Sequence, residues 1–259
     1  MKKALFFDVD GTLLDRNGRM PESTVSALKR TRELGNLIFV NSGRIRPLAR
    51  YATRFAVFDG LLCGCGTEII LGDRSIYRYE IPEKTVNDIR ESCRRCEMDL
   101  LLEGTDGVGI LPDLKSAHMQ RVAQNVRQQG GEVSTGFAGH FPVSKFCMER
   151  ADGGRCRELE QRFGDQFHVM YERGFYECVP LGHDKARAMQ RTLAYLDIPP
   201  EDAYAFGDGL NDLEVLRAAK HAVVMGEHAP ELEAYAELIT KRLEDDGITF
   251  AMKRLGLLD

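Results

Sequence analysis

Hydrophobic and polar positions follow two different patterns along this chain. In the first third, and again beyond residue 184, short apolar runs alternate with stretches whose apolar residues recur at helical spacing. Buried strands that alternate with helices predict a parallel sheet covered by helices. The strands expected here are 4–7, 37–40, 57–63, 203–206, 222–225 and 238–240, and the helices are 21–34, 45–55, 184–195, 211–219, 230–236 and 247–255.

Between these two parts the pattern changes. A hairpin is expected at 69–79, and after it strand-like runs come in neighbouring pairs, which indicates a mixed α+β module. The expected strands are 99–102, 107–111, 143–148, 168–171 and 175–179, and the helices are 83–97, 116–129 and 154–163. We therefore expect an α/β fold. A Rossmann-like, three-layer αβα core in residues 1–81 and 181–259 would be interrupted by a module in residues 82–180.

The composition of the chain narrows the function classes. Its 259 residues are 43% hydrophobic and 29% charged, with a net charge of -5, as in a globular protein with a sizeable core. No basic excess favours nucleic acid, and no apolar run is long enough to cross a bilayer. The N-terminal apolar stretch is too short for a signal peptide. We expect a cytoplasmic protein without nucleic-acid or membrane partners, either a monomer or a weak homodimer.

The cysteines agree with that compartment. There are seven, an odd number, which fits a reducing environment. The spacings Cys63-x-Cys65 and Cys93-x-x-Cys96 each suggest half of a zinc site, but no second pair or suitably spaced histidines accompany them. We therefore expect buried free thiols.

Candidate chemistry begins where the first expected strand ends. Two carboxylates, Asp8 and Asp10, and the hydroxyl of Thr12 follow that strand directly, in the run FFDVDGTLL at residues 6–14. A lone Asp-x-Asp would be interpreted as a solvated turn. Here the apolar flanks bury the turn, and buried carboxylates are costly unless they bind a metal or do chemistry.

Three further polar clusters fall at strand ends or helix starts of the same core. Ser42-Gly43 precedes a helix, where a hydroxyl and free N–H groups suit a phosphate. Lys185 lies near the start of a helix, and residues 207–212 gather carboxylates and a carboxamide that suit a hard cation. Each cluster alone has an ordinary explanation as a turn, a surface lysine or a helix cap. Because ligands of open α/β sheets bind beyond the carboxyl ends of the strands, all four clusters can meet in one crevice.

The chain resembles the haloacid dehalogenase superfamily of phosphohydrolases in the order of these clusters. An acid pair, a hydroxyl, a lysine and an acid cluster follow one another, each at its own joint between strand and helix. All four motifs of the superfamily are matched, and the resemblance covers the whole chain. More narrowly, the chain looks like the Cof-type members, which carry a large α/β cap between the second and third motifs. The resemblance implies that residues 82–180 are such a cap and close over the crevice.

The resemblance also implies a role for each residue of the clusters. Asp8 would attack phosphorus and form an aspartyl-phosphate, while Asp10 would protonate the leaving alcohol and later deprotonate water. Mg²⁺ would be the cofactor and would offset the charge of the attacking anion. The implied metal ligands are Asp8, the main-chain carbonyl of Asp10, Asp208 and, at the edge of the coordination shell, Asp212. The implied phosphate-binding residues are Thr12, Ser42, Gly43, Lys185 and Asn211.

Some positions depart from the Cof-type pattern or stay open. Ser42 stands where relatives usually have Thr, which keeps the hydroxyl. Cys65-Gly66-Thr67 replaces a common Asn-Gly-Ala on the substrate side, which puts the usual contacts with the leaving group in doubt. Arg44 is a candidate for a role near the cap or for a structural ion pair. The candidates for substrate selection in the cap, each with solvated surface as the alternative, are Lys145, Glu172, Arg173 and Tyr176.

Together with these residues, the resemblance implies a Mg²⁺-dependent phosphatase that hydrolyses small phosphorylated metabolites, sugar phosphates first, through an aspartyl-phosphate. The alternative is a sugar phosphomutase, which uses the same intermediate but returns the phosphoryl group to sugar. A non-catalytic module that binds phosphorylated metabolites is the third interpretation. The intact set of Asp8, Asp10, Lys185 and Asp208 disfavours it.

Overall fold

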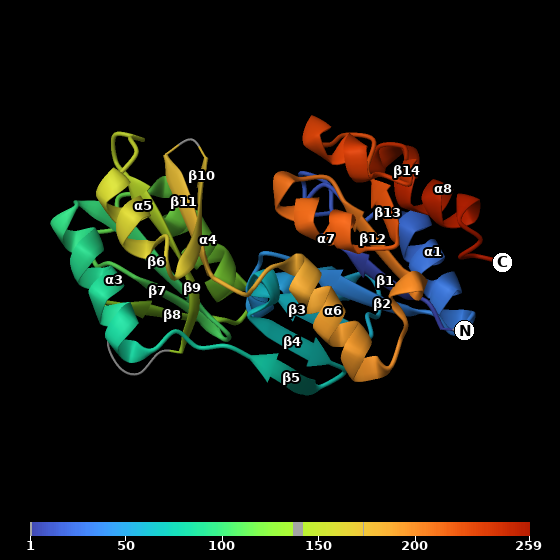
Figure 1. Cartoon of the computed structure of the whole chain (residues 1–259), viewed down its shortest axis with the longest axis horizontal. Helices are drawn as coiled ribbons and strands as arrows, with labels where there is room; N and C mark the ends of the chain where they lie inside the picture. Colours follow the sequence, from blue (N-terminus) through green and yellow to red (C-terminus); the bar gives the residue numbers. More distant parts are fainter. Residues whose placement is uncertain (1, 137–141, 173) are drawn as a thin grey trace. The chain divides into compact units, whose positions relative to one another are not determined.

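The computed structural model of the chain describes residues 2–136, 142–172 and 174–259. They form two compact units, each with its own sheet (Figure 1). The core unit contains residues 1–44, 49–77 and 184–259, and the insertion unit contains residues 45–48 and 78–183. The core unit is therefore assembled from segments on both sides of the insertion. That the insertion unit serves as a cap stays a prediction.

An eight-stranded sheet forms the centre of the core unit. Its strands are β1 (Ala4–Phe7), β2 (Leu37–Asn41), β3 (Gly60–Cys63), β4 (Glu68–Leu71), β5 (Arg74–Arg78), β12 (Ala203–Gly207), β13 (His221–Val224) and β14 (Leu238–Ile239). Their order is β14-β13-β12-β1-β2-β3-β4-β5. Neighbours from β14 to β3 are parallel, and β4 returns antiparallel to β3. Strand β1 therefore lies between β2 and β12, which come from opposite sides of the insertion.

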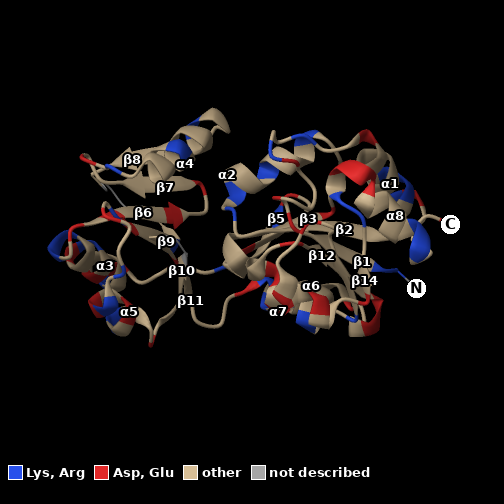
Figure 2. Ribbon diagram, turned by 90° about the horizontal axis from the view of Figure 1, so that it is seen from above, with Lys and Arg blue, Asp and Glu red and all other residues tan. Residues whose placement is uncertain are grey.

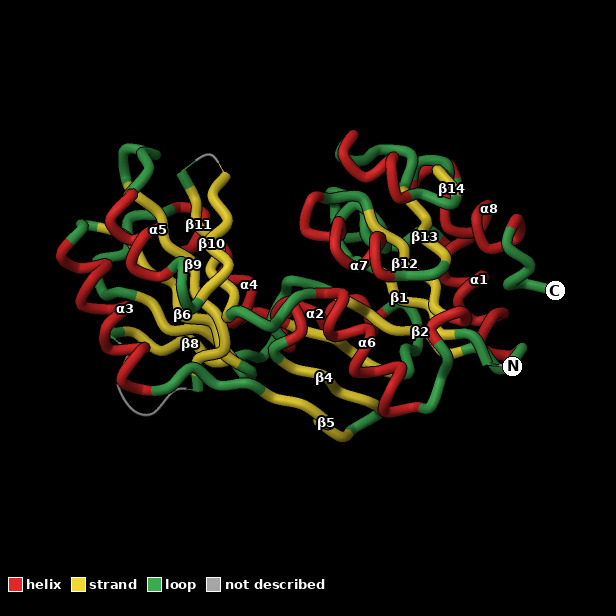
Figure 3. The backbone as a smooth tube through the Cα atoms, in the orientation of Figure 1, coloured by secondary structure: helices red, strands yellow, loops and turns green. Residues whose placement is uncertain are grey.

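Helices cover both faces of this sheet (Figure 3). They are α1 (Glu22–Glu33), α6 (Lys185–Leu196), α7 (Leu213–Ala218) and α8 (Gly247–Arg254). Successive side chains of β1 point to opposite faces: Leu5 and Phe7 pack in a layer with α1 and α8, and Ala4 and Phe6 pack in a layer with α6 and α7. Because both faces are covered, β1 is apolar throughout. The predicted α/β fold with a three-layer αβα core is confirmed.

The insertion unit has a six-stranded mixed sheet in the order β10-β11-β9-β6-β7-β8. Its strands are β6 (Met98–Gly104), β7 (Gly107–Ile110), β8 (Glu132–Thr135), β9 (Val143–Arg150), β10 (Phe167–Glu172) and β11 (Phe175–Pro180). Its helices are α3 (Glu83–Arg95), α4 (Ala117–Gln128) and α5 (Arg157–Phe163). Leu100 and Leu102 pack in one apolar layer with α3 and α5, while Leu101 packs in another with α4. The module is α+β, as its sequence pattern predicts.

Three predicted helices are wrong in detail. Residues 45–55 form a short helix, α2 (Arg46–Ala49), followed by the 3₁₀ segment Arg50–Arg54. Within Arg50–Arg54 only Ala52 is buried, so little apolar packing supports a longer α-helix there. Residues 211–219 begin with the 3₁₀ turn Leu210–Asp212, and 230–236 are 3₁₀ over Pro230–Tyr235.

Charged and sulfur-containing side chains give two further observations. Acidic and basic positions share the same helices, α3, α5 and α7 among them (Figure 2). All seven cysteines are free thiols, six of them buried, and burial raises the pKa of Cys93, Cys147 and Cys178 above the ordinary value.

Within the described residues, no helix combines the length and apolar character that a membrane span requires.

Candidate active site

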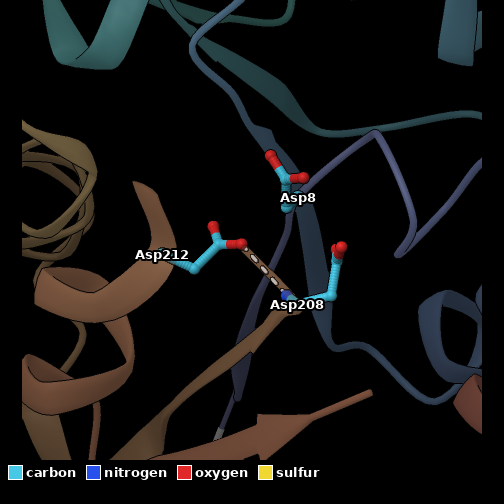
Figure 4. A group of neighbouring side chains, drawn as sticks. All are labelled: Asp8, Asp208 and Asp212. Carbon is cyan, nitrogen blue, oxygen red and sulfur yellow. Dashed lines mark hydrogen bonds between the residues drawn. The ribbon is translucent and has the colours of Figure 1, made fainter. Parts of the chain in front are cut away.

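Two neighbouring parallel strands bring the first carboxylates together. Asp8 follows β1 directly and Asp208 follows β12, and the Asp8 N–H donates to the carbonyl of Phe206 at 3.0 Å, so the ladder continues up to the site. The carboxyl ends of parallel strands share one edge of the sheet. Both carboxylates therefore stand at that edge, with Asp212 beside them (Figure 4).

Lys185 links two of these carboxylates. It is the first residue of α6, a helix capped by the Asp184 side chain, which accepts from the Arg187 N–H at 2.7 Å. Its Nζ lies 2.5 Å from Asp8 Oδ1 and 2.6 Å from Asp212 Oδ1, and all three side chains are buried. Burial alone would lower the pKa of Lys185, but attraction to Asp212 and Asp8 outweighs burial and raises it. Lys185 therefore stays charged inside the site.

Asp212 also organises the loop that carries Asp208. Its Oδ2 accepts the N–H groups of Asp208 and Gly209, at 3.0 and 3.1 Å. A side chain at Gly207 would meet this carboxylate, since a Cβ there would lie 2.5 Å from Asp212 Cγ. Both Asp212 oxygens thus have protein partners, which agrees with an implied place at the edge of a metal shell. Asn211 is exposed, with Oδ1 beside Gly209.

Thr12 and Gly11, in the loop that follows β1, contact or closely approach the Asp208 carboxylate. The buried Thr12 hydroxyl donates to Asp208 Oδ1 at 2.7 Å, so in this structure it holds the carboxylate. Gly11 has a φ of 81°, a left-handed conformation that favours glycine, and a Cβ there would lie 2.3 Å from Asp208 Oδ2. The run after β1 therefore needs glycine at this position for two independent reasons.

Substitution of Gly11 tests both the left-handed backbone and the close approach to Asp208. We expect Gly11→Ala to lower stability by about 1–2 kcal/mol through backbone strain, and also to weaken divalent-cation binding at least about 10-fold by displacing Asp208. Gly35→Ala is the matched control, because Gly35 has a φ of 89° and no atom of the described residues would lie within 4 Å of a Cβ there. Calorimetric titration with Mg²⁺ should show the binding loss in Gly11→Ala alone, and equal binding in both variants would contradict this account.

Three carboxylates crowd together at this edge. One oxygen each from Asp8, Asp208 and Asp212 lies within 4.8 Å of the other two. Burial raises the pKa of Asp8 to about 7, against the pull of Lys185, and burial raises the pKa of Asp208 to about 6. When all are ionised, three carboxylates and one ammonium leave two negative charges without compensation. The cluster therefore fits a hard divalent cation with oxygen ligands.

The second polar loop, at residues 41–44, approaches the same edge from β2. Ser42 is buried, and its Oγ accepts the N–H of Arg44 at 3.2 Å. Asn41, for which the sequence suggested no role, donates from Nδ2 to the Lys185 carbonyl at 2.9 Å, while its own Oδ1 has no hydrogen-bond partner among the described residues. Ser42 and Gly43 thus belong to a loop that is tied to the first turn of α6.

Asp10 does not join the three carboxylates. Its side chain is 65% exposed and forms a forked ion pair with Arg44. Arg44 Nε donates to Oδ2 at 2.8 Å, and Nη2 donates to Oδ1 at 2.5 Å. Of the two roles suggested for Arg44, the structure shows an ion pair, and its partner is a predicted site residue. No sequence signal pointed to this pairing, because 34 residues separate the two side chains.

Lys145, a candidate for substrate selection, is not solvated in the structure. Its Nζ lies 3.0 Å from Glu103 Oε2 and 2.5 Å from Glu177 Oε1 within the sheet of the insertion unit. Its side chain is only 4% exposed. Cross-strand partners on β6 and β11 therefore account for the burial of this charge.

The remaining candidates of the insertion unit divide into two groups. Tyr176 is buried, and its hydroxyl accepts the Cys156 N–H at 2.6 Å and donates to Glu160 Oε1 at 2.8 Å. Burial raises its pKa to about 12. These contacts tie β11 to α5 and give Tyr176 a structural place. The side chain of Glu172 and the whole of Arg173 lie outside the described residues.

Comparison with known proteins gives evidence of the family that is independent of the geometry of the site. A family model described as "haloacid dehalogenase-like hydrolase" matches residues 5–252. The chain is 26% identical to the YkrA protein of Bacillus subtilis over 99% of this chain and 98% of that one. It is 28% identical to an HMP-PP phosphatase of Klebsiella pneumoniae, over 90% and 88% of the two chains. Among solved structures, the HAD subclass IIB sugar phosphatase BT4131 superposes with a TM-score of 0.82 at 24% identity, covering 99% of this chain and 100% of that one.

Proposed function

Because this chain belongs to the haloacid dehalogenase-like hydrolases, we propose that it is a Mg²⁺-dependent phosphatase of small phosphorylated metabolites, with sugar phosphates as the first substrate class. The family predicted from the sequence is confirmed by the match over residues 5–252. The observation that carries the proposal is the buried contact of Lys185 Nζ with Asp8 and Asp212, beside Asp208. This arrangement supports the proposal because it gathers the proposed nucleophile Asp8, the ammonium of Lys185 and carboxylates that could bind a metal ion at one edge of the sheet.

The proposed reaction proceeds in two steps. An oxygen of Asp8 attacks phosphorus, the bond to the leaving oxygen breaks, and Asp10 gives that oxygen a proton. Water then attacks the phosphorus of the aspartyl-phosphate, Asp10 takes the water proton, and the bond to Asp8 breaks to release inorganic phosphate. Lys185 and the Ser42 loop would hold the phosphoryl oxygens while negative charge develops there.

The carboxylate cluster supports a place for Mg²⁺ in this reaction. Asp8, the Asp10 carbonyl and Asp208 would hold it, and Asp212 would orient Asp208 through the loop N–H groups that it binds. When bound, Mg²⁺ would offset the charge of the phosphoryl oxygens and of the attacking carboxylate. The two uncompensated negative charges of the cluster are the reason that a divalent cation fits.

Removal and addition of Mg²⁺ test this proposal. Purified protein should release phosphate from p-nitrophenyl phosphate with Mg²⁺, and excess EDTA should abolish the release. Independently of activity, Mg²⁺ at about 100 times its Kd should raise Tm by roughly 5 °C, since binding to the folded state alone stabilises it. Asp208→Asn should lose most of that shift. An unchanged Tm with Mg²⁺, together with EDTA-resistant turnover, would refute the metal assignment.

A panel of phosphorylated metabolites tests the substrate class. Sugar phosphates, other small phosphomonoesters and HMP-PP should be ranked by kcat/KM, because the named relatives include an HMP-PP phosphatase and a sugar phosphatase. We expect the highest values among the sugar phosphates. A preference for HMP-PP above every sugar phosphate would replace the substrate class and leave the phosphatase proposal intact.

A further inference from the structure

The forked ion pair between Arg44 and Asp10 constrains the proposed acid/base residue. Two separate N–H groups of one guanidinium reach the two oxygens of one carboxylate, at 2.8 and 2.5 Å. A bidentate pair fixes both the position and the plane of a carboxylate, which a single contact does not. Although 65% of the Asp10 side chain is exposed, its orientation is therefore defined.

Arg44 is itself held by the structure around it. Its N–H donates to Ser42 Oγ at 3.2 Å, and its carbonyl accepts the N–H of Gly64 at 2.9 Å. Its side chain is 30% exposed. The guanidinium thus projects from a backbone anchored between the Ser42 loop and the end of β3. This anchoring makes Arg44 a fixed support for Asp10.

We propose that Arg44 is a positioning residue that orients Asp10 as the general base for the second step, hydrolysis of the aspartyl-phosphate. This inference rests on the proposed function. In that step the ionised carboxylate of Asp10 takes a proton from water, the water oxygen bonds to phosphorus, and the bond to Asp8 breaks. A carboxylate that accepts two N–H groups of Arg44 keeps lone pairs free for that proton. The fork therefore suits the step in which Asp10 takes a proton.

The kinetics of p-nitrophenyl phosphate separate the two steps. p-Nitrophenolate leaves without protonation, so phosphorylation of Asp8 should stay fast when Asp10 is misplaced. Arg44→Ala should therefore give a rapid burst of p-nitrophenolate approaching one per active site, followed by turnover about 10²-fold slower than wild type. Stopped-flow absorbance measures both phases. A role limited to folding would not create a burst.

Four further variants sharpen this test. Arg44→Lys keeps the charge without the fork and should also show the burst, so it decides the matter if Arg44→Ala does not fold. Asp10→Asn should show the same burst, and the double variant should be no slower than Asp10→Asn alone. Arg16→Ala removes an exposed arginine paired with Glu227 and should behave as wild type.

The outcomes distinguish a failure of the role of Arg44 from a failure of the proposed phosphatase function. A burst in Asp10→Asn with wild-type kinetics in the Arg44 variants would overturn the role of Arg44 alone. Loss of both burst and turnover in the Arg44 variants would also overturn it, because Arg44 would then act on the first step or on substrate binding. Wild-type kinetics in Asp10→Asn would remove Asp10 as the base, and the proposed mechanism would fail with it.

Discussion

Replacement of Asp8 by Asn is expected to lower Mg²⁺-dependent turnover of p-nitrophenyl phosphate by at least about 10³-fold, because the amide has no anionic oxygen to attack phosphorus. The fold should survive, since Asn has nearly the same shape and its oxygen can still accept from Lys185 Nζ, now 2.5 Å from Asp8. Removal of a buried carboxylate with a raised pKa should leave Tm unchanged or higher. Steady-state kinetics and thermal denaturation measure the two effects.

Asp15→Asn is the control for this substitution. Asp15 lies on the same loop but outside the carboxylate cluster, where its Oδ1 accepts the N–H groups of Asn17 and Arg19, both at 2.8 Å. The amide oxygen of Asn can accept the same bonds, so activity should stay near that of wild type. Substantial turnover by Asp8→Asn, or accumulation of a phosphorylated form in that variant, would remove Asp8 as the nucleophile.

Replacement of Lys185 by Met is expected to impair both stability and catalysis. The variant leaves the buried carboxylates of Asp8 and Asp212 without their common counter-ion, and breaking a buried pair costs about 3–5 kcal/mol. The variant also lacks the cation that would hold the phosphoryl oxygens. Its kcat should therefore fall by about 10²- to 10³-fold, the usual effect of removing one hydrogen-bond donor from an oxyanion hole. Chemical denaturation and kinetics on p-nitrophenyl phosphate measure the two losses.

The stability loss in Lys185→Met should depend on pH. In the folded protein the pKa of Asp8 is raised from 3.8 to about 7, so between these values the folded state binds more protons than the unfolded state. The stability of metal-free protein should therefore fall as pH rises through this window. Without Lys185 the pKa of Asp8 should rise further, and the fall should continue to higher pH. In chelator, the Tm difference between variant and wild type should be larger at pH 8 than at pH 5, and an equal difference at both would point to lost packing instead.

The sequence predicted the central strands of the core and the clusters beside them because both signals are local. Ala4–Phe7 is an uninterrupted apolar run buried on both faces, and its polar successors must lie at the edge of the sheet. By contrast, β8 was not predicted, since Glu132–Thr135 is polar and only half-buried. A strand at the edge of a sheet carries little of the apolar pattern on which such predictions depend.

The individual contacts of the candidate site residues could not be predicted from the sequence. Lys185 had the pattern of an ordinary helical lysine, and its contacts with Asp8 and Asp212 span 177 and 27 residues. Lys145 was a candidate for substrate selection, with solvated surface as the alternative, but partners from neighbouring strands bury it. Such pairings depend on strand order and register, which no single stretch of sequence encodes.

The position of β1 between β2 and β12 has a consequence for how the chain folds during synthesis. While the insertion emerges from the ribosome, β1 has β2 on one side, and its other edge stays open until residues 203–207 have been made. Such an open apolar edge can pair with other chains. The insertion unit has its own sheet and apolar layers, so it can complete its structure first. The edge of β1 that faces β12 therefore stays available for such pairing until the whole insertion and β12 have been made.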